Sequence, residues 1–263
     1  MDRVTLSIDS GIAEVALNRP DKRNALDMEM FRALDSVSQS LADRKDVRAV
    51  ILRGEGPSFC AGLDVMAVMG GGPKNIAELI DERQGPANLV QRVAWNWRQL
   101  PMPVIAALHG HVYGGGLQIA LGADIRIAHP DAKLAVMEIV WGIIPDMGIT
   151  ATWLPWARRD VIKELTYTGR VLNGPEALEV GLVTSVNPEP LEAARHLAQS
   201  IAGRNPHAIR AAKQLLDRAA DMDVHEAFEL ETELQRPLLG SPNQMEASMA
   251  RVQRRPAKFK DPE

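Results

Sequence analysis

The protein is a chain of 263 residues with a formal net charge of −4, and 46% of its residues are hydrophobic, 24% charged and 4% aromatic. These fractions are typical of a soluble globular protein, and a chain of this length buries enough surface to fold without disulfides or a structural metal. The single cysteine, Cys60, excludes a disulfide scaffold and any zinc site built from several cysteines. The pI near 5.9 and the absence of a basic stripe argue against a nucleic-acid partner.

The N-terminus leads directly into an alternating apolar pattern, without the apolar core of a signal peptide. No stretch of about 18 uncharged apolar residues is present, so no membrane-spanning segment is expected. We therefore expect a soluble, reduced, cytoplasmic protein that contacts neither a membrane nor nucleic acid.

The first half of the chain alternates short apolar strands with helices and loops. Alternating apolar residues on both sides of Asp9-Ser10-Gly11 predict a β-hairpin over 4–17. Asp27 is placed to cap a helix whose apolar residues recur at steps of four and three from Met30. Further strands are predicted at 49–52, 104–107, 124–128 and 134–137. Strands separated by helices or loops in this way are typical of an α/β fold.

After Thr150 the chain is mostly helical. Helices are predicted over 164–168, 175–180, 191–202, 209–220 and 224–238, with one last strand at 183–186. Asn205-Pro206 is a typical helix start, with asparagine as the cap and proline at the first helical position. We therefore divide the chain into an α/β core, residues 1–190, and a helical C-terminal region, residues 191–263, that packs on the core or on another subunit.

Two loops of small residues follow predicted buried strands. The first is Ser58–Asp64, and the second is Gly114–Gly116 at the start of a helix. Each loop leaves backbone N–H groups free, and a helix N-terminus suits an oxyanion. Either loop alone is most often only a tight connection. Together they can supply two donors to one oxygen, which makes them a candidate oxyanion hole.

Glu138 and Asp146 lie in a very apolar segment that contains Ile, Val, Trp and Met. A carboxyl group in such surroundings is expected to have a raised pKa and can carry a proton. The alternative is structural, because either acid can cap a helix or pair with Arg158 or Arg159.

Other reactive residues have weaker patterns. His109 and His111 lack a third ligand at a usual metal spacing, so we interpret them as structural or pocket-lining residues. Cys60 has no histidine or lysine beside it and is expected to act as a small buried hydrophobe. No metal site is predicted.

Several motifs occur in an order that resembles the crotonase, or enoyl-CoA hydratase/isomerase, superfamily over nearly the whole chain. The motifs are Asn18-Arg19-Pro20 with Asn24-Ala25-Leu26, Phe59–Asp64, Pro103–Gly110, Gly114–Gly116, Ala123–Arg126 and Glu138–Gly148. The resemblance implies an α/β fold built as a spiral of ββα repeats, with a helical C-terminal region that forms trimers, which often pair into hexamers. It also implies an acyl-CoA thioester substrate, with CoA as part of the substrate and no separate cofactor or metal.

The resemblance further implies roles for particular residues. The backbone N–H groups of Leu63 and Gly115 are expected to form the oxyanion hole. The CoA-binding residues are expected to be Lys22, Arg23, Ala25, Leu26, Ala61 and Asp64, with Phe259 and Lys260 reaching the CoA of a neighbouring subunit.

The acids depart from the hydratase pattern. Hydratases of the family use two glutamates; one corresponds to Glu138, and the other stands where this chain has Gln118. An amide cannot exchange a proton near neutral pH, so Gln118 does not replace an acid. Asp146 stands where hydratases usually have glycine, and the dienoyl-CoA isomerases of the family have aspartate at that position. They also have aspartate where Gln118 stands, so the resemblance to this subgroup is imperfect there.

The favoured prediction is therefore an enzyme that shifts double bonds in enoyl- or dienoyl-CoA, with Glu138 and Asp146 as the acid/base pair. Three alternatives stay open. The first is an enoyl-CoA hydratase, and the second is a non-catalytic acyl-CoA binder. The third, a CoA-thioester hydrolase, is the least favoured. Acyl-chain length, and which acid is the base, are not assigned.

Overall fold

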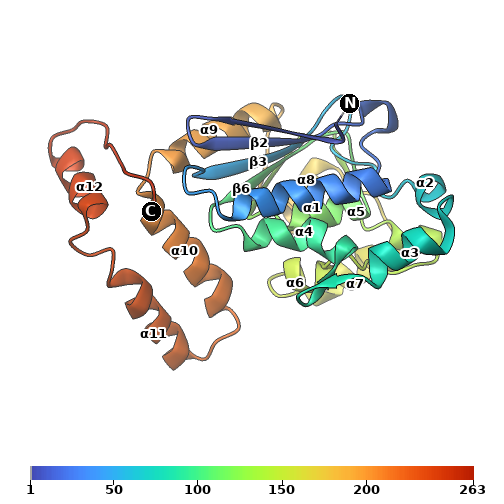
Figure 1. Ribbon diagram of the computed structural model, residues 1–263. Coiled ribbons are helices and arrows are strands. Elements are labelled where there is room, and N and C mark those ends of the chain that lie inside the picture. The colour runs from blue at the N-terminus through green and yellow to red at the C-terminus, as the bar shows by residue number, and fades with distance from the viewer. Residues whose placement is uncertain (1) are drawn as a thin grey trace.

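A six-stranded mixed sheet forms the centre of the computed structural model, which describes residues 2–263 (Figure 1). The strands lie in the order β1-β2-β3-β6-β8-β10. Their bounds are β1 Val4–Asp9, β2 Ile12–Leu17, β3 Ala49–Gly54, β6 Val104–Leu108, β8 Ile125–Ala128 and β10 Ser185–Val186. The predicted hairpin is present, since β1 and β2 pair antiparallel, and all later pairs in this sheet are parallel.

A second, shorter set of strand contacts lies beside the main sheet and gives the fold its spiral. Strand β7, His111–Tyr113, pairs in parallel with β9, Lys133–Ala135. Isolated bridges extend this ladder from Cys60 to Val112 and from Leu134 to Leu172. Each turn therefore places one strand in the main sheet and a second in the ladder before the chain turns away. This is the predicted crotonase-like α/β fold of ββα repeats.

Helices cover both faces of the main sheet. On one face lie α1 Met28–Ala42, α4 Leu89–Gln99 and α5 Gly115–Leu121, over the larger apolar core (Figure 1). The cap prediction for α1 is confirmed, because the Asp27 side chain accepts a hydrogen bond from the Met30 amide. On the other face α9, Pro190–Ala202, packs its buried Ala194 and Ala198 against β3, β6 and β8. Helix α9 thus belongs to the packing of the sheet.

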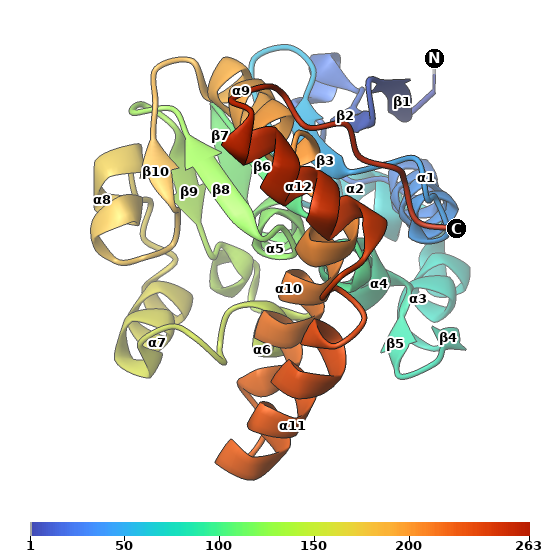
Figure 2. The ribbon, with the colours of Figure 1, turned by 90° about the vertical axis from the view of Figure 1, so that its left-hand side faces the viewer.

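The last three helices extend away from the sheet. They are α10 Pro206–Ala219, α11 Val224–Gln235 and α12 Pro242–Val252, and the chain after α12 returns towards the end of α1 (Figures 1 and 2). Asn205 caps α10 as the sequence predicts. Many apolar side chains on these helices are exposed, among them Leu216, Phe228, Met249 and Val252. No described helix is both long and apolar enough to cross a membrane.

The remaining elements connect these layers. They are η1 Pro20–Lys22, α2 Val65–Met69, α3 Gly72–Ile80, β4 Arg83–Gln84, β5 Ala87–Asn88, η2 Glu138–Trp141, α6 Ile149–Thr152, α7 Arg159–Thr168 and α8 Gly174–Glu179. Helices α2 and α12 are absent from the predicted elements. Both begin at a capping side chain, Asp64 for α2 and Ser241 for α12, so a local signal was present in the sequence.

The close packing of α5 on α4 gives a prediction about stability. Gly122 ends α5 at a φ of −71°, and a Cβ added there would lie 2.0 Å from the Ala94 carbonyl oxygen. Gly122→Ala should therefore lower the free energy of unfolding by about 3 kcal/mol through overpacking. Gly203 is a matched control, since it ends α9 at a φ of −77° and an added Cβ would meet nothing closer than 3.4 Å. Urea denaturation checks both variants, and equal stability losses would contradict this account.

Candidate functional site

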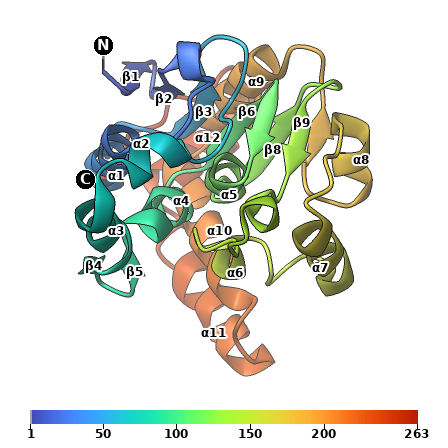
Figure 3. The same ribbon diagram turned by 90° about the vertical axis from the view of Figure 1, so that its right-hand side faces the viewer.

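The candidate site lies where the chain leaves three neighbouring parallel strands. Strands β2, β3 and β6 end at Leu17, Gly54 and Leu108, and parallel strands end at the same edge of a sheet. The segments that follow are joined by two bridges, Leu26 with Leu63 and Cys60 with Val112. Figure 3 shows α2 and α5, which begin directly after these segments, on the same side of the sheet.

The amides of Leu63 and Gly115 have no protein acceptor among the described residues. In the bridge to Leu26, the hydrogen bonds use the oxygen of Gly62 and the amide of Asp64, which leaves the Leu63 N–H unused. Gly115 is the first residue of α5, so its N–H has no carbonyl one turn earlier in the helix. A Cβ built on Gly62 would lie 3.9 Å from the Gly115 nitrogen, so the two loops are in close proximity.

Each of the three glycines at the start of α5 lies close to another segment of the chain, and at Gly115 and Gly116 a side chain would collide with it. A Cβ on Gly114 would lie 3.4 Å from Glu138 Oε1, and the φ of Gly114 is +50°. A Cβ on Gly115 would lie 2.6 Å from Met147 Sδ, and one on Gly116 would lie 2.6 Å from Cys60 Cβ. The glycine run therefore brings the 60–63 loop and the 138–147 segment together at one place.

Glu138 and Gln118 form a buried pair. The Glu138 residue is 7% exposed and Gln118 is 1% exposed. Gln118 Nε2 donates to Glu138 Oε1 at 2.6 Å, and Gln118 Oε1 accepts from the Met147 amide at 2.9 Å. The second carboxylate oxygen, Oε2, is buried without a partner. Burial raises the pKa of Glu138; the Gln118 hydrogen bond lowers this pKa and the nearby charge of Asp146 raises it.

Asp146 is the more open of the two acids. The residue is exposed, yet the protein atoms around its carboxyl still desolvate it and raise its pKa. Its charge reaches Glu138 strongly enough to contribute to the raised pKa of that group. The site therefore holds two carboxyl groups with raised pKa values in unlike surroundings.

The structural alternatives for the two acids are not observed. Arg158 pairs with Asp160, and neither Glu138 nor Asp146 forms an ion pair within residues 2–263. Glu138 is the first residue of η2, whose N-cap is Met137, and no side chain caps this helix. The acids are thus neither helix caps nor salt-bridge partners, which is the pattern expected for groups that act on a ligand.

The expected CoA-binding residues before α1 lie on the turn that follows β2. Lys22 and Arg23 are exposed, and Ala25 and Leu26 lead into the bridge with Leu63. The Ala61 amide donates to the Arg23 carbonyl at 2.9 Å, so this turn and the 61–64 loop are directly connected. The structure therefore brings Lys22, Arg23, Ala25, Leu26, Ala61 and Asp64 together.

The two tail residues lie elsewhere. Arg48 Nη2 donates to the Phe259 carbonyl at 3.0 Å, and Lys260 exchanges two hydrogen bonds with Asn243. Arg48 directly precedes β3, whereas the candidate site follows the other end of this strand, about 20 Å away for six extended residues. Phe259 and Lys260 therefore do not join the candidate site of their own chain.

The weaker candidates have structural contacts. Cys60 is fully buried, its thiol donates to the Asn24 carbonyl, and burial raises its pKa to about 12, so it is not a nucleophile. His109 contacts the Gly56 carbonyl and His111 contacts the Ser58 hydroxyl. Residues 2–263 contain no group of three His, Cys, Asp or Glu side chains placed to hold a metal ion.

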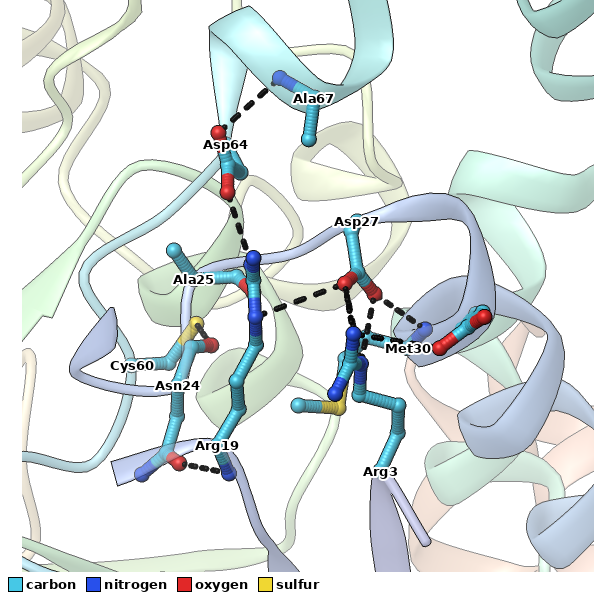
Figure 4. Close-up of polar contacts among 10 residues, drawn as sticks. Arg3, Arg19, Asn24, Ala25, Asp27, Met30, Cys60, Asp64 and Ala67 are labelled. Carbon is cyan, nitrogen blue, oxygen red and sulfur yellow. Dashed lines mark hydrogen bonds and ion pairs between the residues drawn. The ribbon is translucent and has the colours of Figure 1, made fainter. Parts of the chain in front are cut away.

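A polar network behind the 61–64 loop was not predicted as part of the site. Figure 4 shows the Arg19 guanidinium between Asp64 and Asp27, with Arg3 on the far side of Asp27. Beside it, Asn24 is fully buried and donates to the carbonyls of Ser58 and Phe59. The available signal was the Asn18-Arg19-Pro20 segment itself, which places a cation two residues after the end of a buried strand.

The chain is similar to known proteins in sequence and in structure. The chain matches the family model "Enoyl-CoA hydratase/isomerase" over residues 7–262. The mitochondrial Delta(3,5)-Delta(2,4)-dienoyl-CoA isomerase of Rattus norvegicus is 34% identical, covering 85% of this chain and 71% of the relative. The short-chain-enoyl-CoA hydratase of Clostridium acetobutylicum is 31% identical, covering 97% of this chain and 96% of the relative. The crystal structure of an enoyl-CoA hydratase from Bacillus anthracis superposes with a TM-score of 0.90 at 29% identity, covering 98% of this chain and 99% of the other.

The raised pKa of Glu138 predicts a pH-dependent change in stability. The buried carboxylate destabilises the fold when ionised, so its cost is present above the folded pKa and absent below the ordinary value of 4.5. Glu138→Gln should therefore be more stable than the parent at pH 8, and the difference should vanish as the pH falls below 4.5. Thermal unfolding across this range measures it.

Glu246→Gln is the control with the opposite sign. The side-chain hydrogen bond with Arg255 lowers the pKa of Glu246 to about 2, so its neutral variant should lose stability at pH 8 rather than gain it. A gain for Glu138→Gln that is the same at every pH would show that ionisation of Glu138 is not its cause.

Proposed function

Since the chain belongs to the enoyl-CoA hydratase/isomerase family of the crotonase superfamily, we propose that it shifts double bonds in enoyl- or dienoyl-CoA thioesters. The observation that carries the proposal is the pairing of Glu138 with an amide, Gln118, while the second carboxyl near it is Asp146. Glu138 and Asp146 are thus the two proton carriers, and position 118, where hydratases of the family have their second glutamate, holds an amide.

The proposed reaction removes a proton at one end of the diene and adds a proton at the other. One carboxylate removes a proton from C2 of a 3,5-dienoyl thioester, and the electron pair of that C–H bond delocalises onto the thioester oxygen as an extended enolate that reaches C6. The other group, as a carboxylic acid, gives a proton to C6, and the double bonds settle at C2 and C4. No oxidant or water is consumed. The base has then gained the C2 proton and the acid has lost the proton given to C6, and exchange with solvent returns both groups to their starting states.

The unused amides of Leu63 and Gly115 are the proposed oxyanion hole. Their lack of protein acceptors and the closeness of their loops support this role. Negative charge develops on the thioester oxygen only as C2 loses its proton, so donors fixed there stabilise the transition state more than the ground state. Removing one such donor typically costs about 2.7–4 kcal/mol of transition-state stabilisation.

The raised pKa values of Glu138 and Asp146 support a role as proton carriers. A carboxyl whose pKa lies above its ordinary range can hold a proton nearer to neutral pH and is a stronger base when ionised. The unpartnered Oε2 of Glu138 leaves one oxygen free for the substrate, while Gln118 holds the other. We therefore assign Gln118 a positioning role.

A hydratase is the second candidate, and the similarity to the Clostridium acetobutylicum enzyme favours it. Water addition needs a group that activates water and a proton for C2, and Glu138 with Asp146 would have to supply both. A non-catalytic acyl-CoA binder is less favoured, because a buried carboxylate with an unpartnered oxygen is costly unless it is used.

We also propose that CoA lies along the turn at residues 22–26 and the 61–64 loop. The exposed Lys22 and Arg23 provide positive charge for its phosphates there. We further propose a homotrimer or hexamer formed through α10–α12, whose exposed apolar side chains would be covered by neighbouring subunits. Phe259 and Lys260 would then face the CoA of a neighbour, which agrees with their distance from their own site.

A direct assay with two substrates tests the proposal. The wild-type protein should convert a 3,5-dienoyl-CoA to the 2,4-isomer faster than it hydrates crotonyl-CoA, with both reactions followed by ultraviolet absorbance. Asp146→Asn should lower kcat for isomerisation by about 10²- to 10⁴-fold, the usual contribution of a general acid or base. Asp131→Asn should leave kcat unchanged, because this aspartate is exposed and, within residues 2–263, its only ionic contact is with His129 at 4.0 Å. Rapid hydration of crotonyl-CoA that is insensitive to Asp146→Asn would contradict the isomerase proposal.

Replacing the amide by an acid tests the role of Gln118. In Gln118→Glu the new carboxyl would lie where Nε2 now stands, 2.6 Å from Glu138 Oε1. Like charges at this distance cannot both ionise, so the acid limb of the kcat profile should move to higher pH. Hydration of crotonyl-CoA should rise at the same time, because two acids would then share the site. An unchanged pH profile would show that Gln118 does not contact the group that titrates in catalysis.

A further inference from the structure

Arg19 connects the turn after β2 to the loop that carries Leu63. Its Nη1 atom donates to Asp64 Oδ2 at 2.8 Å and to the Ala25 carbonyl at 3.1 Å. Its Nε atom lies 3.5 Å from Asp27 Oδ2. One arginine side chain, of which 12% is exposed, thus contacts three residues on two segments, Ala25 and Asp27 on one and Asp64 on the other (Figure 4).

These contacts flank the Leu63 peptide group. The Leu26 amide donates to the Gly62 carbonyl at 2.8 Å, and the Asp64 amide donates to the Leu26 carbonyl at 3.0 Å. Asp64 is also fixed through its Oδ1, which accepts from the Ala67 amide and caps α2. Arg19 therefore ties the residue after Leu63 to the residue before Leu26, and so sets the spacing between the two paired segments.

The two acidic partners of Arg19 differ in how much they depend on it. Asp27 has a second cation, since Arg3 Nη2 lies 2.8 Å from its Oδ2. Asp64 has Arg19 as its only ion-pair partner among the described residues. Loss of Arg19 would leave the cap of α1 supported by Arg3, while the 63–64 peptide would lose its charged anchor. Loss of Arg19 should therefore disturb the 61–64 loop and leave the rest of the fold in place.

We propose that Arg19 is a positioning residue for the Leu63 amide, holding this donor where the thioester oxygen binds. This inference rests on the proposed oxyanion hole and goes beyond it by naming the side chain that sets its geometry. Arg19 touches no substrate atom in this account. The planar guanidinium donates to Asp64 and Ala25 from Nη1 and faces Asp27 with Nε. The single ammonium group of lysine cannot make all three contacts.

The expected effect is a loss of transition-state stabilisation with little change in ground-state binding. Removing an oxyanion donor typically lowers kcat by about 10²- to 10³-fold, and displacing one should cost less, about 10- to 100-fold. Arg19→Met should show this fall in kcat with KM changed by less than about threefold, since the charge on the oxygen is greatest in the transition state. Arg19→Lys should recover part of the lost kcat, because the lysine ammonium can still form an ion pair with Asp64.

The direct readout is the carbonyl stretch of a bound thioester. Hexanoyl-CoA with a ¹³C thioester carbonyl has no double bond, so it is neither isomerised nor hydrated, and its C=O frequency in infrared difference spectra reports hydrogen bonding to that oxygen. Binding to the wild type should lower the frequency, and Arg19→Met should lose most of this shift. The matched control is Arg3→Met, which removes the other cation of Asp27 and should keep both the shift and kcat. If Arg19→Met does not fold, Asp64→Asn replaces it, because its amide oxygen can still accept from Ala67 while the ion pair is lost.

The outcomes separate this proposal from the proposed function. A full carbonyl shift in Arg19→Met, or no shift in the wild type, would overturn the role of Arg19. A shift that depends on Arg19 in a protein that does not isomerise dienoyl-CoA would support Arg19 and contradict the isomerase proposal. An equal loss of the shift in Arg3→Met would show a general disturbance of the Asp27 network and would also overturn the specific role of Arg19.

Discussion

Close backbone contact at the start of α5 is the constraint on which the candidate site depends. Gly114 has a φ of +50°, which favours glycine, and a Cβ on Gly115 or Gly116 would collide with Met147 or Cys60. Packing at this density leaves two backbone amides without protein acceptors next to each other. Leu63 is exposed, so a ligand can reach its free donor, and this links the packing of the fold to its chemistry.

The electrostatics of the site follow from unequal burial of two acids. Glu138 is surrounded by protein and has one hydrogen bond, from Gln118, whereas Asp146 lies on the open side. Gln118 also accepts from the Met147 amide, so the segment that carries Asp146 is attached to the partner of Glu138. One neutral side chain thus connects the Glu138 carboxylate to the backbone next to Asp146 without adding a charge between them.

Much of this arrangement can be predicted from the sequence, because it is encoded locally. Alternation gives the β1–β2 hairpin, the cap at Asp27 gives α1, and the ordered motifs give the family and its spiral fold. The position of α9 cannot be read in this way. Its alanines pack on the sheet only because β3, β6 and β8 present small and branched residues to them, and these strands lie far from α9 in the sequence.

The roles of Gln118 and Arg19 also depend on long-range geometry. The sequence identifies Gln118 as a departure from the hydratase pattern, but its two-ended contact with Glu138 and Met147 appears only in the fold. Arg19 and Asp64 are 45 positions apart, and no local pattern pairs them. Position-resolved deuterium labelling tests the central claim, that Glu138 and Asp146 serve separate ends of one proton transfer, most directly. In D₂O, the account predicts that neutralising one acid stops exchange at C2 and neutralising the other stops labelling at C6 of the dienoyl-CoA. Loss of the same single step in both variants, or label only at carbons where water adds, would contradict it.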